Sequence, residues 1–307
     1  MRPMLLAMPG NEELAASLRQ ALGAEPVTLA MRRFPDAETY LRINSDVNGC
    51  AVAVVCTLQD PDARFLPLVF MADTLRELGT RSVGLVAPYL AYMRQDRRFQ
   101  AGEAITSASF ARLLSARFDW LLTVDPHLHR RESLAEIYTI PTEIAQAAPL
   151  LAEWIRGQVQ DPLVVGPDSE SEQWVRAVAE AVPCPHIVLE KTRHGDRDVS
   201  VSPLPDLSGL SGRTPVLIDD IVSSARTMIE TVKLLRVAGR RAPVCLAVHG
   251  LFTAGAYEAL REAGAAQIVS TNSVPHTSNA IDLTPILTGP VSRLAAAPAT
   301  HVRSSGP

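Results

Sequence analysis

Short, almost uninterrupted apolar runs alternate with helical segments along most of this 307-residue chain. Runs of this kind are typical of strands that are buried on both faces of a parallel sheet, where a helix connects one strand with the next. Helix signals separate the runs, with Asp60–Pro61 at one start and Gly79 at one end. The predicted strands are residues 50–57, 82–88, 120–125, 162–168, 214–220, 244–250 and 267–271. The pattern predicts an α/β fold of mostly parallel sheets flanked by helices.

The same plan occurs twice, and the chain is long enough for two domains. We predict an N-terminal domain over residues 1–145 and a C-terminal domain over residues 146–307. The first helix is expected to follow an N-cap at Asn11 and to end at Gly23. The tail from about Ala295 is rich in alanine, proline and serine, and we expect it to fray.

Composition limits the partners and the compartment. The formal net charge is −4 and no block of lysine or arginine occurs, so neither nucleic acid nor an anionic membrane is an expected partner. The four cysteines form no CxxC pair, which favours a reducing compartment. No run reaches the roughly 20 apolar residues of a membrane helix, and the N-terminal apolar run is interrupted at Pro9–Gly10. We therefore expect a soluble, cytoplasmic protein.

Polar residues follow five of the predicted strands, at the sheet edge where ligands bind in open α/β folds. The most informative segment is residues 216–227, in which two adjacent aspartates end an apolar strand and a Ser-Ala-Arg-Thr loop opens a helix. Backbone N–H groups at a helix start hold phosphate, and the carboxylates suit sugar hydroxyls or Mg²⁺. An acidic pair at a helix start, with Ser223 as N-cap, is the structural alternative.

This segment resembles the ribose-phosphate-binding loop of type I phosphoribosyltransferases and of ribose-phosphate pyrophosphokinases. Other segments resemble the second family in its order: RRFPDAETYLRI (32–43), PYLAYMRQDRRF (88–99), TVDPHLHR (123–130), EKTRHGDRDVSV (190–201) and TNSVPH (271–276). The chain is identified as a member of the ribose-phosphate pyrophosphokinase family. The resemblance implies two tandem type I phosphoribosyltransferase-like domains, with ATP-side motifs in the first and the ribose 5-phosphate loop and a catalytic lid in the second.

The implied reaction transfers the diphosphate of ATP to the 1-hydroxyl of ribose 5-phosphate. The products are 5-phosphoribosyl 1-diphosphate, for nucleotide biosynthesis, and AMP. The family also implies Mg²⁺ as cofactor and a homo-oligomer, either a dimer or a dimer-based hexamer. Two alternatives stay open: a non-catalytic regulatory homologue of the enzyme, and a phosphoribosyltransferase that consumes the activated ribose.

The resemblance assigns site residues by position. The ATP-binding residues are Phe34, Asp36, Glu38, Arg94, Gln95 and Arg97. The catalytic lid residues are Lys191 and Arg193, and the metal-linked residues are His127 and Asp168. The ribose-phosphate-binding residues are Asp219, Asp220, Ser223, Ser224, Ala225, Arg226 and Thr227.

Some positions depart from the family pattern or depend on the backbone. Ala225 and Arg226 replace two glycines of the usual Thr-Gly-Gly-Thr loop, so a positive φ is expected to be less available there. Arg226 either binds the 5-phosphate or fills the site. The acidic residues after Asp168 either recruit Mg²⁺, repel diphosphate or only stabilise the next helix. If the backbone stays extended, Asp125 and His127 point to the same side.

Overall fold

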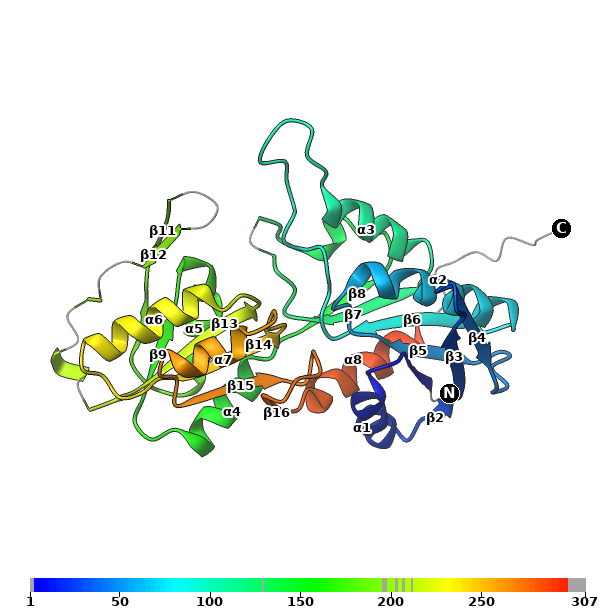
Figure 1. Ribbon diagram of the computed structural model, residues 1–307. Helices are drawn as coiled ribbons and strands as arrows, with labels where there is room; N and C mark the ends of the chain where they lie inside the picture. The colour runs from blue at the N-terminus through cyan, green and yellow to red at the C-terminus, as the bar shows by residue number, and fades with distance from the viewer. Residues whose placement is uncertain are drawn as a thin grey trace. The chain divides into compact units, whose positions relative to one another are not determined.

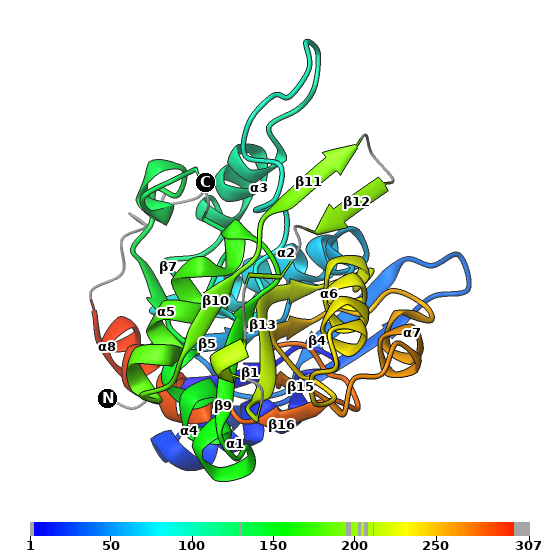
Figure 2. The same cartoon turned by 90° about the vertical axis from the view of Figure 1, so that its left-hand side faces the viewer.

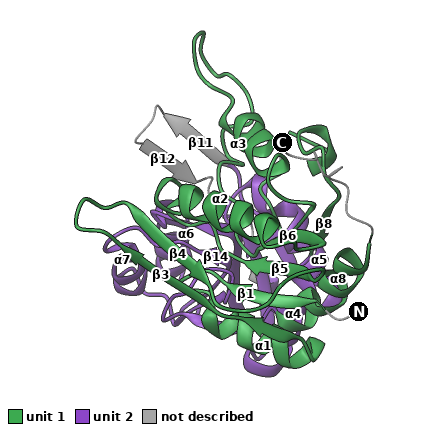
Figure 3. Ribbon diagram, turned by 90° about the vertical axis from the view of Figure 1, so that its right-hand side faces the viewer, with its two compact units in different colours: residues 1–145, 284–307 green, residues 146–283 purple. Residues whose placement is uncertain are grey.

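Two compact units make up the chain (Figure 3). The computed structural model describes residues 3–128, 130–194, 198–201, 204–205, 208–210 and 212–297. Unit 1 contains residues 1–145 and the segment that begins at Thr284, and unit 2 contains residues 146–283. The predicted domains, 1–145 and 146–307, differ from these units at the C-terminus, because the last helix packs in unit 1.

Unit 1 is built on a six-stranded parallel sheet with the order β2-β1-β5-β6-β7-β8. The strands are β1 (Met4–Ala7), β2 (Glu25–Val27), β5 (Ala51–Val55), β6 (Ser82–Ala87), β7 (Trp120–Val124) and β8 (Thr142–Ala145). All residues of β5, β6 and β7 are buried, because helices cover both faces of the sheet (Figure 1). One face carries α1 (Glu12–Leu22) and α8 (Thr284–Ala296), and the other carries α2 (Pro61–Glu77) and α3 (Thr106–Ser115).

A separate antiparallel hairpin in unit 1 consists of β3 (Leu29–Arg33) and β4 (Thr39–Ile43). It packs against α2. The sequence pattern did not predict these two strands.

Unit 2 repeats the architecture with the strand order β10-β9-β13-β14-β15-β16, again all parallel. The strands are β9 (Pro162–Gly166), β10 (His186–Val188), β13 (Thr214–Val222), β14 (Val244–Gly250), β15 (Gln267–Thr271) and β16 (Asn279–Ile281). The helices α4 (Ala148–Gln158) and α5 (Glu172–Ala181) cover one face, and α6 (Arg226–Val237) and α7 (Ala256–Glu262) cover the other (Figure 2). A second hairpin, β11 (Lys191–His194) with β12 (Asp198–Val201), is separate from this sheet.

These two sheets confirm the predicted fold class, and the predicted strands agree with the structure to within one or two residues at most ends. Helix α1 also begins and ends as predicted, with Gly23 in the left-handed conformation at φ 57°. Asn11 precedes α1, but its side chain does not cap the helix. Its Nδ2 instead donates to the Met8 carbonyl at 3.1 Å and its Oδ1 accepts from the Thr57 N–H at 2.7 Å. Asn11 thus joins the ends of β1 and β5.

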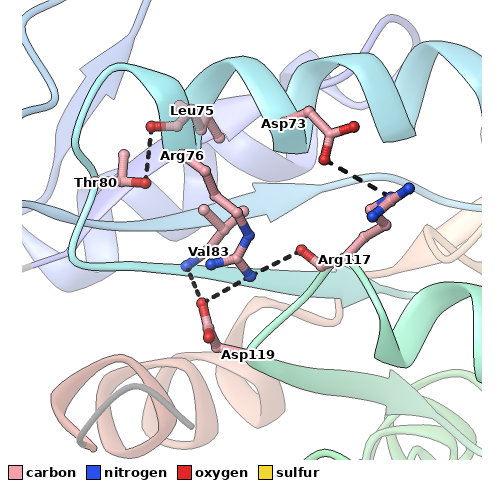
Figure 4. A network of polar contacts seen from close by, with 7 residues as sticks. All are labelled: Asp73, Leu75, Arg76, Thr80, Val83, Arg117 and Asp119. Atoms are coloured by element: carbon pink, nitrogen blue, oxygen red, sulfur yellow. Dashed lines mark hydrogen bonds and ion pairs between the residues drawn. The ribbon is translucent and has the colours of Figure 1, made fainter. Parts of the chain in front are cut away.

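A buried ion pair lies at the opposite, amino edge of the unit 1 sheet (Figure 4). The Asp119 side chain is 1% exposed, and its Oδ2 accepts from Arg76 Nη2 at 3.2 Å and from the Val83 N–H at 2.7 Å. Arg76 also donates to the Arg117 carbonyl at 2.9 Å. The network connects the end of α2 with the starts of β6 and β7. It therefore lies at the end of the sheet opposite to the carboxyl ends of these strands.

Helix α8 was not predicted. Its Leu287 and Val291 are fully buried, and the helix contacts α1 and strands β5 to β8. The part of the expected fraying tail that follows Ala297 lies outside the described residues. Within the described part of the chain, no helix combines the length and the apolar composition that crossing a bilayer requires.

Candidate substrate-binding and catalytic site

The aspartate pair lies at the carboxyl end of β13 in unit 2. The strand continues through Val222, and Asp219 pairs with Ala247 of β14. Adjacent residues of a strand face opposite sides of the sheet, so the two carboxyl groups leave the strand on different faces. Asp220 is buried, and Asp219 keeps some exposed surface although protein atoms surround its carboxyl group. Asp219 Oδ1 accepts from the Asp220 N–H at 3.0 Å, and Asp220 Oδ1 accepts from the Ile221 N–H at 2.8 Å.

Three carboxyl groups influence one another at this edge. Burial raises the pKa of Asp219 well above its usual range, and the negative charges of Asp220 and Asp168 raise that pKa further. Burial and like charges both disfavour the ionised form. Unit 2 therefore concentrates negative charge at the place where the sequence predicts sugar and metal binding.

The loop after the pair opens helix α6. Ala225 immediately precedes α6 and adopts the left-handed conformation, with φ 57° and ψ 7°. Ala225 thus adopts the positive φ that was expected to be less available without glycine. No side chain caps α6 from this position. Ser223 does not act as the N-cap either, and its carbonyl accepts the Thr253 N–H at 3.0 Å, which ties the loop to the segment after β14.

The remaining loop residues differ in exposure. Ser224 and Arg226 are exposed, and Thr227 is half-buried in the first turn of α6. The Arg226 side chain is therefore not packed into the loop. The N–H groups of the first turn and the positive end of the helix dipole face this loop, which is the arrangement that binds phosphate.

Asp168 follows β9 at the same edge of unit 2. It is buried, and its Oδ1 accepts from the Glu170 N–H at 3.1 Å. The hydroxyl of Ser171 donates to the Asp168 carbonyl at 2.6 Å. The acidic residues after Asp168 form a short 3₁₀ turn, Ser169–Ser171, and Glu172 lies in the first turn of α5. The helix-stabilising interpretation of these acids therefore has direct structural support.

Lys191 and Arg193 belong to β11. Lys191 pairs with Val201 and Arg193 pairs with Val199 in the antiparallel hairpin. Their side chains lie outside the part of the chain that the structure describes.

His127 follows β7 in unit 1 and is half-buried. β7 ends at Val124, and Asp125 has a positive φ of 32°. The condition of an extended backbone therefore does not hold, and the expectation that Asp125 and His127 point to the same side does not apply. The chain turns at Asp125, whose N–H donates to the Ala145 carbonyl at 3.1 Å.

Phe34, Asp36 and Glu38 lie at the turn of the β3–β4 hairpin in unit 1. The Phe34 N–H donates to the Glu38 carbonyl at 2.8 Å, and Ala37 takes a positive φ of 70°. The Phe34 ring is 38% exposed, and the Arg32 guanidinium lies 4.4 Å from its centroid. Asp36 and Glu38 line a groove of ≈ 530 Å³ beside α2. An exposed ring beside two carboxylates can stack on a base and accept from its amino group.

Arg94, Gln95 and Arg97 lie in the long loop between β6 and α3. Gln95 is fixed, since its Oε1 accepts from the Thr106 hydroxyl at 3.0 Å. Arg94 and Arg97 are exposed. The Arg97 guanidinium lies 4.8 Å from the centroid of the Phe99 ring.

The structure brings some predicted residues together within a unit. Asp168, Asp219 and Asp220 gather at one edge of unit 2, and the hairpin residues gather beside α2 in unit 1. His127 belongs to unit 1 and Asp168 belongs to unit 2. Among the described residues, no three His, Cys, Asp or Glu side chains form a group that could hold a metal ion unaided.

Asp96 is an important residue that the sequence pattern did not single out. It lies within the RQDRR run, where it is the only acid among arginines, yet its side chain is 4% exposed and pairs with Arg130. A single aspartate among arginines was the only sign in the sequence that this residue is special. The sequence gave no sign that its partner would be Arg130, 34 residues later.

Comparisons with known proteins cover nearly the whole chain. Residues 3–117 match the N-terminal domain of ribose phosphate pyrophosphokinase, and residues 133–283 match the phosphoribosyl transferase domain. A ribose-phosphate pyrophosphokinase of Sulfurisphaera tokodaii is 33% identical over 260 residues, which are 83% of this chain and 88% of that protein. The chain belongs to the ribose-phosphate pyrophosphokinase family.

Two further relatives agree with this assignment. A ribose-phosphate pyrophosphokinase of Methanopyrus kandleri is 32% identical over 284 residues, covering 92% of this chain and 96% of that protein. The crystal structure of the phosphoribosylpyrophosphate synthetase of Mycobacterium smegmatis superposes with a TM-score of 0.83 at 25% identity, covering 95% of this chain and 98% of that one. The predicted family and enzyme class are confirmed. The match of residues 3–117 to the N-terminal domain of ribose phosphate pyrophosphokinase argues against the alternative of a phosphoribosyltransferase.

Proposed function

We propose that this chain transfers the diphosphate of ATP to the 1-hydroxyl of ribose 5-phosphate, forming 5-phosphoribosyl 1-diphosphate and AMP. The observation that carries the proposal is the match of both domains to ribose-phosphate pyrophosphokinases. In the reaction the ribose 1-oxygen bonds to the β-phosphorus, the bond between that phosphorus and the oxygen bridging to the α-phosphorus breaks, and AMP leaves. Such a transfer depends mainly on alignment and on stabilisation of charge on phosphate oxygens.

The ribose 5-phosphate end of the reaction belongs to unit 2. Asp219 and Asp220 bind the ribose hydroxyls, and the loop of Ser223 to Thr227 with the start of α6 binds the 5-phosphate. Arg226 stands where the family pattern has a glycine. Replacing Arg226 by glycine therefore tests whether this loop binds the 5-phosphate. We expect the KM for ribose 5-phosphate to rise about tenfold, because a charge-assisted hydrogen bond is lost. A gain in activity would instead show that Arg226 obstructs the site.

The ATP end belongs to unit 1. Arg94, Gln95 and Arg97 bind the nucleotide, with arginine suited to phosphate oxygens through paired N–H groups. Phe34, Asp36 and Glu38 recognise the adenine of an ATP bound by a neighbouring subunit, so the active protein is a homo-oligomer, a dimer or a dimer-based hexamer. The reaction serves nucleotide biosynthesis in the cytoplasm.

Mg²⁺ fits the donor set of unit 2. Burial raises the pKa of Asp219 most, and the repulsion from Asp220 and Asp168 adds to it; a cation would relieve that repulsion. Mg²⁺ keeps several waters and binds through one or two carboxylates plus substrate phosphates, so it does not need a group of three protein ligands. Asp168 would hold it directly. In unit 1, His127 would contribute to metal binding only through a metal-bound water, because imidazole is not a preferred ligand of Mg²⁺. When bound, Mg²⁺ offsets charge on the phosphates.

Lys191 and Arg193 stabilise the transferring diphosphoryl group as the hairpin that carries them closes over the substrates. The test is the rate of AMP formation from ATP and ribose 5-phosphate with Mg²⁺, in the wild type and in Lys191→Ala. We expect a loss of about 100-fold or more, comparable to the removal of one strong transition-state donor.

Lys233 offers a matched control, because it is the only other lysine in the sequence. It lies on the exposed side of α6 and pairs with Glu230 at 3.0 Å, an ion pair that contributes little to stability. Lys233→Ala should retain activity. No turnover by folded wild type would favour the regulatory homologue, and an active Lys191→Ala would exclude the proposed role of Lys191.

A further inference from the structure

The carboxylate of Asp96 connects two loops at the carboxyl edge of the unit 1 sheet. Asp96 lies in the loop after β6, and Arg130 and Arg131 lie in the loop after β7. Arg130 Nη1 lies 3.1 Å from Asp96 Oδ1 and 3.3 Å from Oδ2. Arg131 Nη2 donates to the Asp96 carbonyl at 3.1 Å. We name these three residues the Asp96 cluster.

We propose that Asp96 is a positioning residue for ATP: through Arg130 and Arg131 it fixes the loop of Arg94 and Gln95 against the loop of His127. The inference rests on the proposed function for its kinetic consequence. Asp96 is two residues from Arg94, and Arg130 is three residues from His127. A shift of either loop would therefore move groups that we assign to ATP and to the metal-bound phosphates.

The burial of the cluster explains why its charge matters. The Asp96 side chain is 4% exposed, whereas that of Arg130 is 38% exposed. A buried carboxylate needs a cationic partner, and the loss of one member leaves the other uncompensated. Arg131 is fixed independently, because it also pairs with Glu136 at 3.4 Å. Glu136 in turn accepts the N–H groups of Glu132 and Ser133, so Arg131 is held against an internally bonded turn.

The cluster also orders the outer part of the first loop. The Arg130 guanidinium lies 5.5 Å from the centroid of the Phe99 ring, on which Arg97 also lies at 4.8 Å. Phe99 is 54% exposed, and the two arginines are the residues described in contact with its ring. Asp96 thereby also influences the position of Arg97: Asp96 holds Arg130, and Arg130 and Arg97 both contact the Phe99 ring.

Asp96→Asn tests the proposal while conserving side-chain volume. The new amide is neutral and keeps only one accepting oxygen, and it presents an NH2 group to a guanidinium that can only donate. The charged contact with Arg130 is therefore lost, while the main-chain contact with Arg131 can persist. We expect the KM for ATP to rise about tenfold or more, as for a lost charge-assisted hydrogen bond. The KM for ribose 5-phosphate should stay within about twofold, because its binding residues belong to unit 2. Hydrogen exchange in the ligand-free protein should increase in residues 88–105 and 125–133.

Asp119→Asn is the matched control. Asp119 is likewise a buried aspartate of unit 1 with an arginine partner, at 3.2 Å, but at the amino edge of the sheet. The Asp119→Asn variant should have a lower melting temperature, but its KM for ATP and its KM for ribose 5-phosphate should not change. A KM for ATP that rises equally in both variants would overturn the proposal, because it would reflect general destabilisation.

A double-mutant cycle shows whether Asp96 acts through Arg130. Asp96→Asn combined with Arg130→Met should raise the KM for ATP no more than about twofold beyond the larger single effect. Multiplying effects would overturn the proposed connection. If Asp96→Asn does not fold, Arg130→Met carries the comparison, because its side chain is more exposed. If the wild type forms no AMP, the proposed function fails, and the exchange data alone then decide whether Asp96 joins the loops.

Discussion

Left-handed backbone in non-glycine residues recurs in the loops that follow the parallel strands. Such residues follow five strands: Asp60 after β5, Tyr92 after β6, Asp125 after β7, Ala225 after β13 and Phe252 after β14. Each costs on the order of 1–2 kcal/mol relative to the right-handed region. The strain is thus located at the sheet edges that carry the predicted site residues, which is where a chain must turn sharply to present side chains to a ligand.

Ala225 allows this strain to be measured. Ala225→Gly should raise the stability of unit 2 by about 0.5 kcal/mol, because relief of the left-handed conformation exceeds the added entropy of the unfolded chain. Denaturant unfolding of unit 2 measures the effect. Ala238 follows the other end of α6 with φ −74°, so Ala238→Gly gains no relief and should destabilise. Equal effects of the two changes would contradict the strain assigned to Ala225.

The carboxyl cluster of unit 2 makes stability depend on pH. The raised pKa of Asp219 means that the folded state holds this proton more tightly than the unfolded state. Stability from this group is therefore complete below the ordinary carboxyl pKa of about 3.9 and is lost as the pH rises toward the raised value. Asp219→Asn should remove the loss, so that its melting temperature increasingly exceeds that of the wild type from about pH 4 upward, measured without Mg²⁺. A difference that does not vary with pH would contradict this cause.

The same residue links stability to function. Asp219→Asn should reduce activity while it raises stability, because the repelling carboxylates are retained for binding rather than for folding.

Among the elements, β6 and β7 depend on one glycine. A Cβ at Gly84 would lie only 1.8–2.3 Å from atoms of the Trp120 ring, and Trp120 is 3% exposed. Gly84→Ala should destabilise unit 1 by about 3 kcal/mol through overpacking. Calorimetric unfolding of unit 1 provides the measurement.

A second substitution separates overpacking from a backbone effect. Gly84→Ala with Trp120→Leu should be more stable than the sum of the two single effects, because the smaller side chain makes room for the methyl group. Additive losses would indicate a backbone requirement for glycine instead.

The central strands were predictable because helices bury both of their faces, which leaves unbroken apolar runs in the sequence. Helix α8 was not predictable in this way, since TPILTGPVSRLAA contains Gly289 and Pro290, which favour interruption. Its burial against α1 and the sheet overrides that preference. The Asp96–Arg130 pair and the turn at Asp125 were missed for a related reason, because both depend on contacts between distant segments. By contrast, the loop after β13 was found from local pattern alone, since strand, acids and helix start are consecutive.

For the whole molecule, the chain path predicts the effect of a truncation. Deleting residues 284–307 removes α8 and its buried Leu287 and Val291, so unit 1 should lose its cooperative unfolding transition while unit 2 keeps its own. Hydrogen exchange resolved by segment measures both. Deleting only residues 298–307 leaves α8 intact and serves as the control. Loss of unit 2 instead would contradict the assignment of α8 to unit 1.

The return of the chain to unit 1 at Thr284 also orders its biosynthesis. Residues 146–283 leave the ribosome before α8 does. Unit 2 is therefore complete while the face of the unit 1 sheet that carries α1 still lacks its second helix, α8. Domains fold as units during synthesis, but here the N-terminal one waits for the last described helix. Unit 1 therefore acquires its full protection only once α8 has emerged and packed against the sheet. Until then, the apolar surface of β5, β6 and β7 that α8 covers stays exposed on the nascent chain, and transiently exposed surface of this kind favours aggregation.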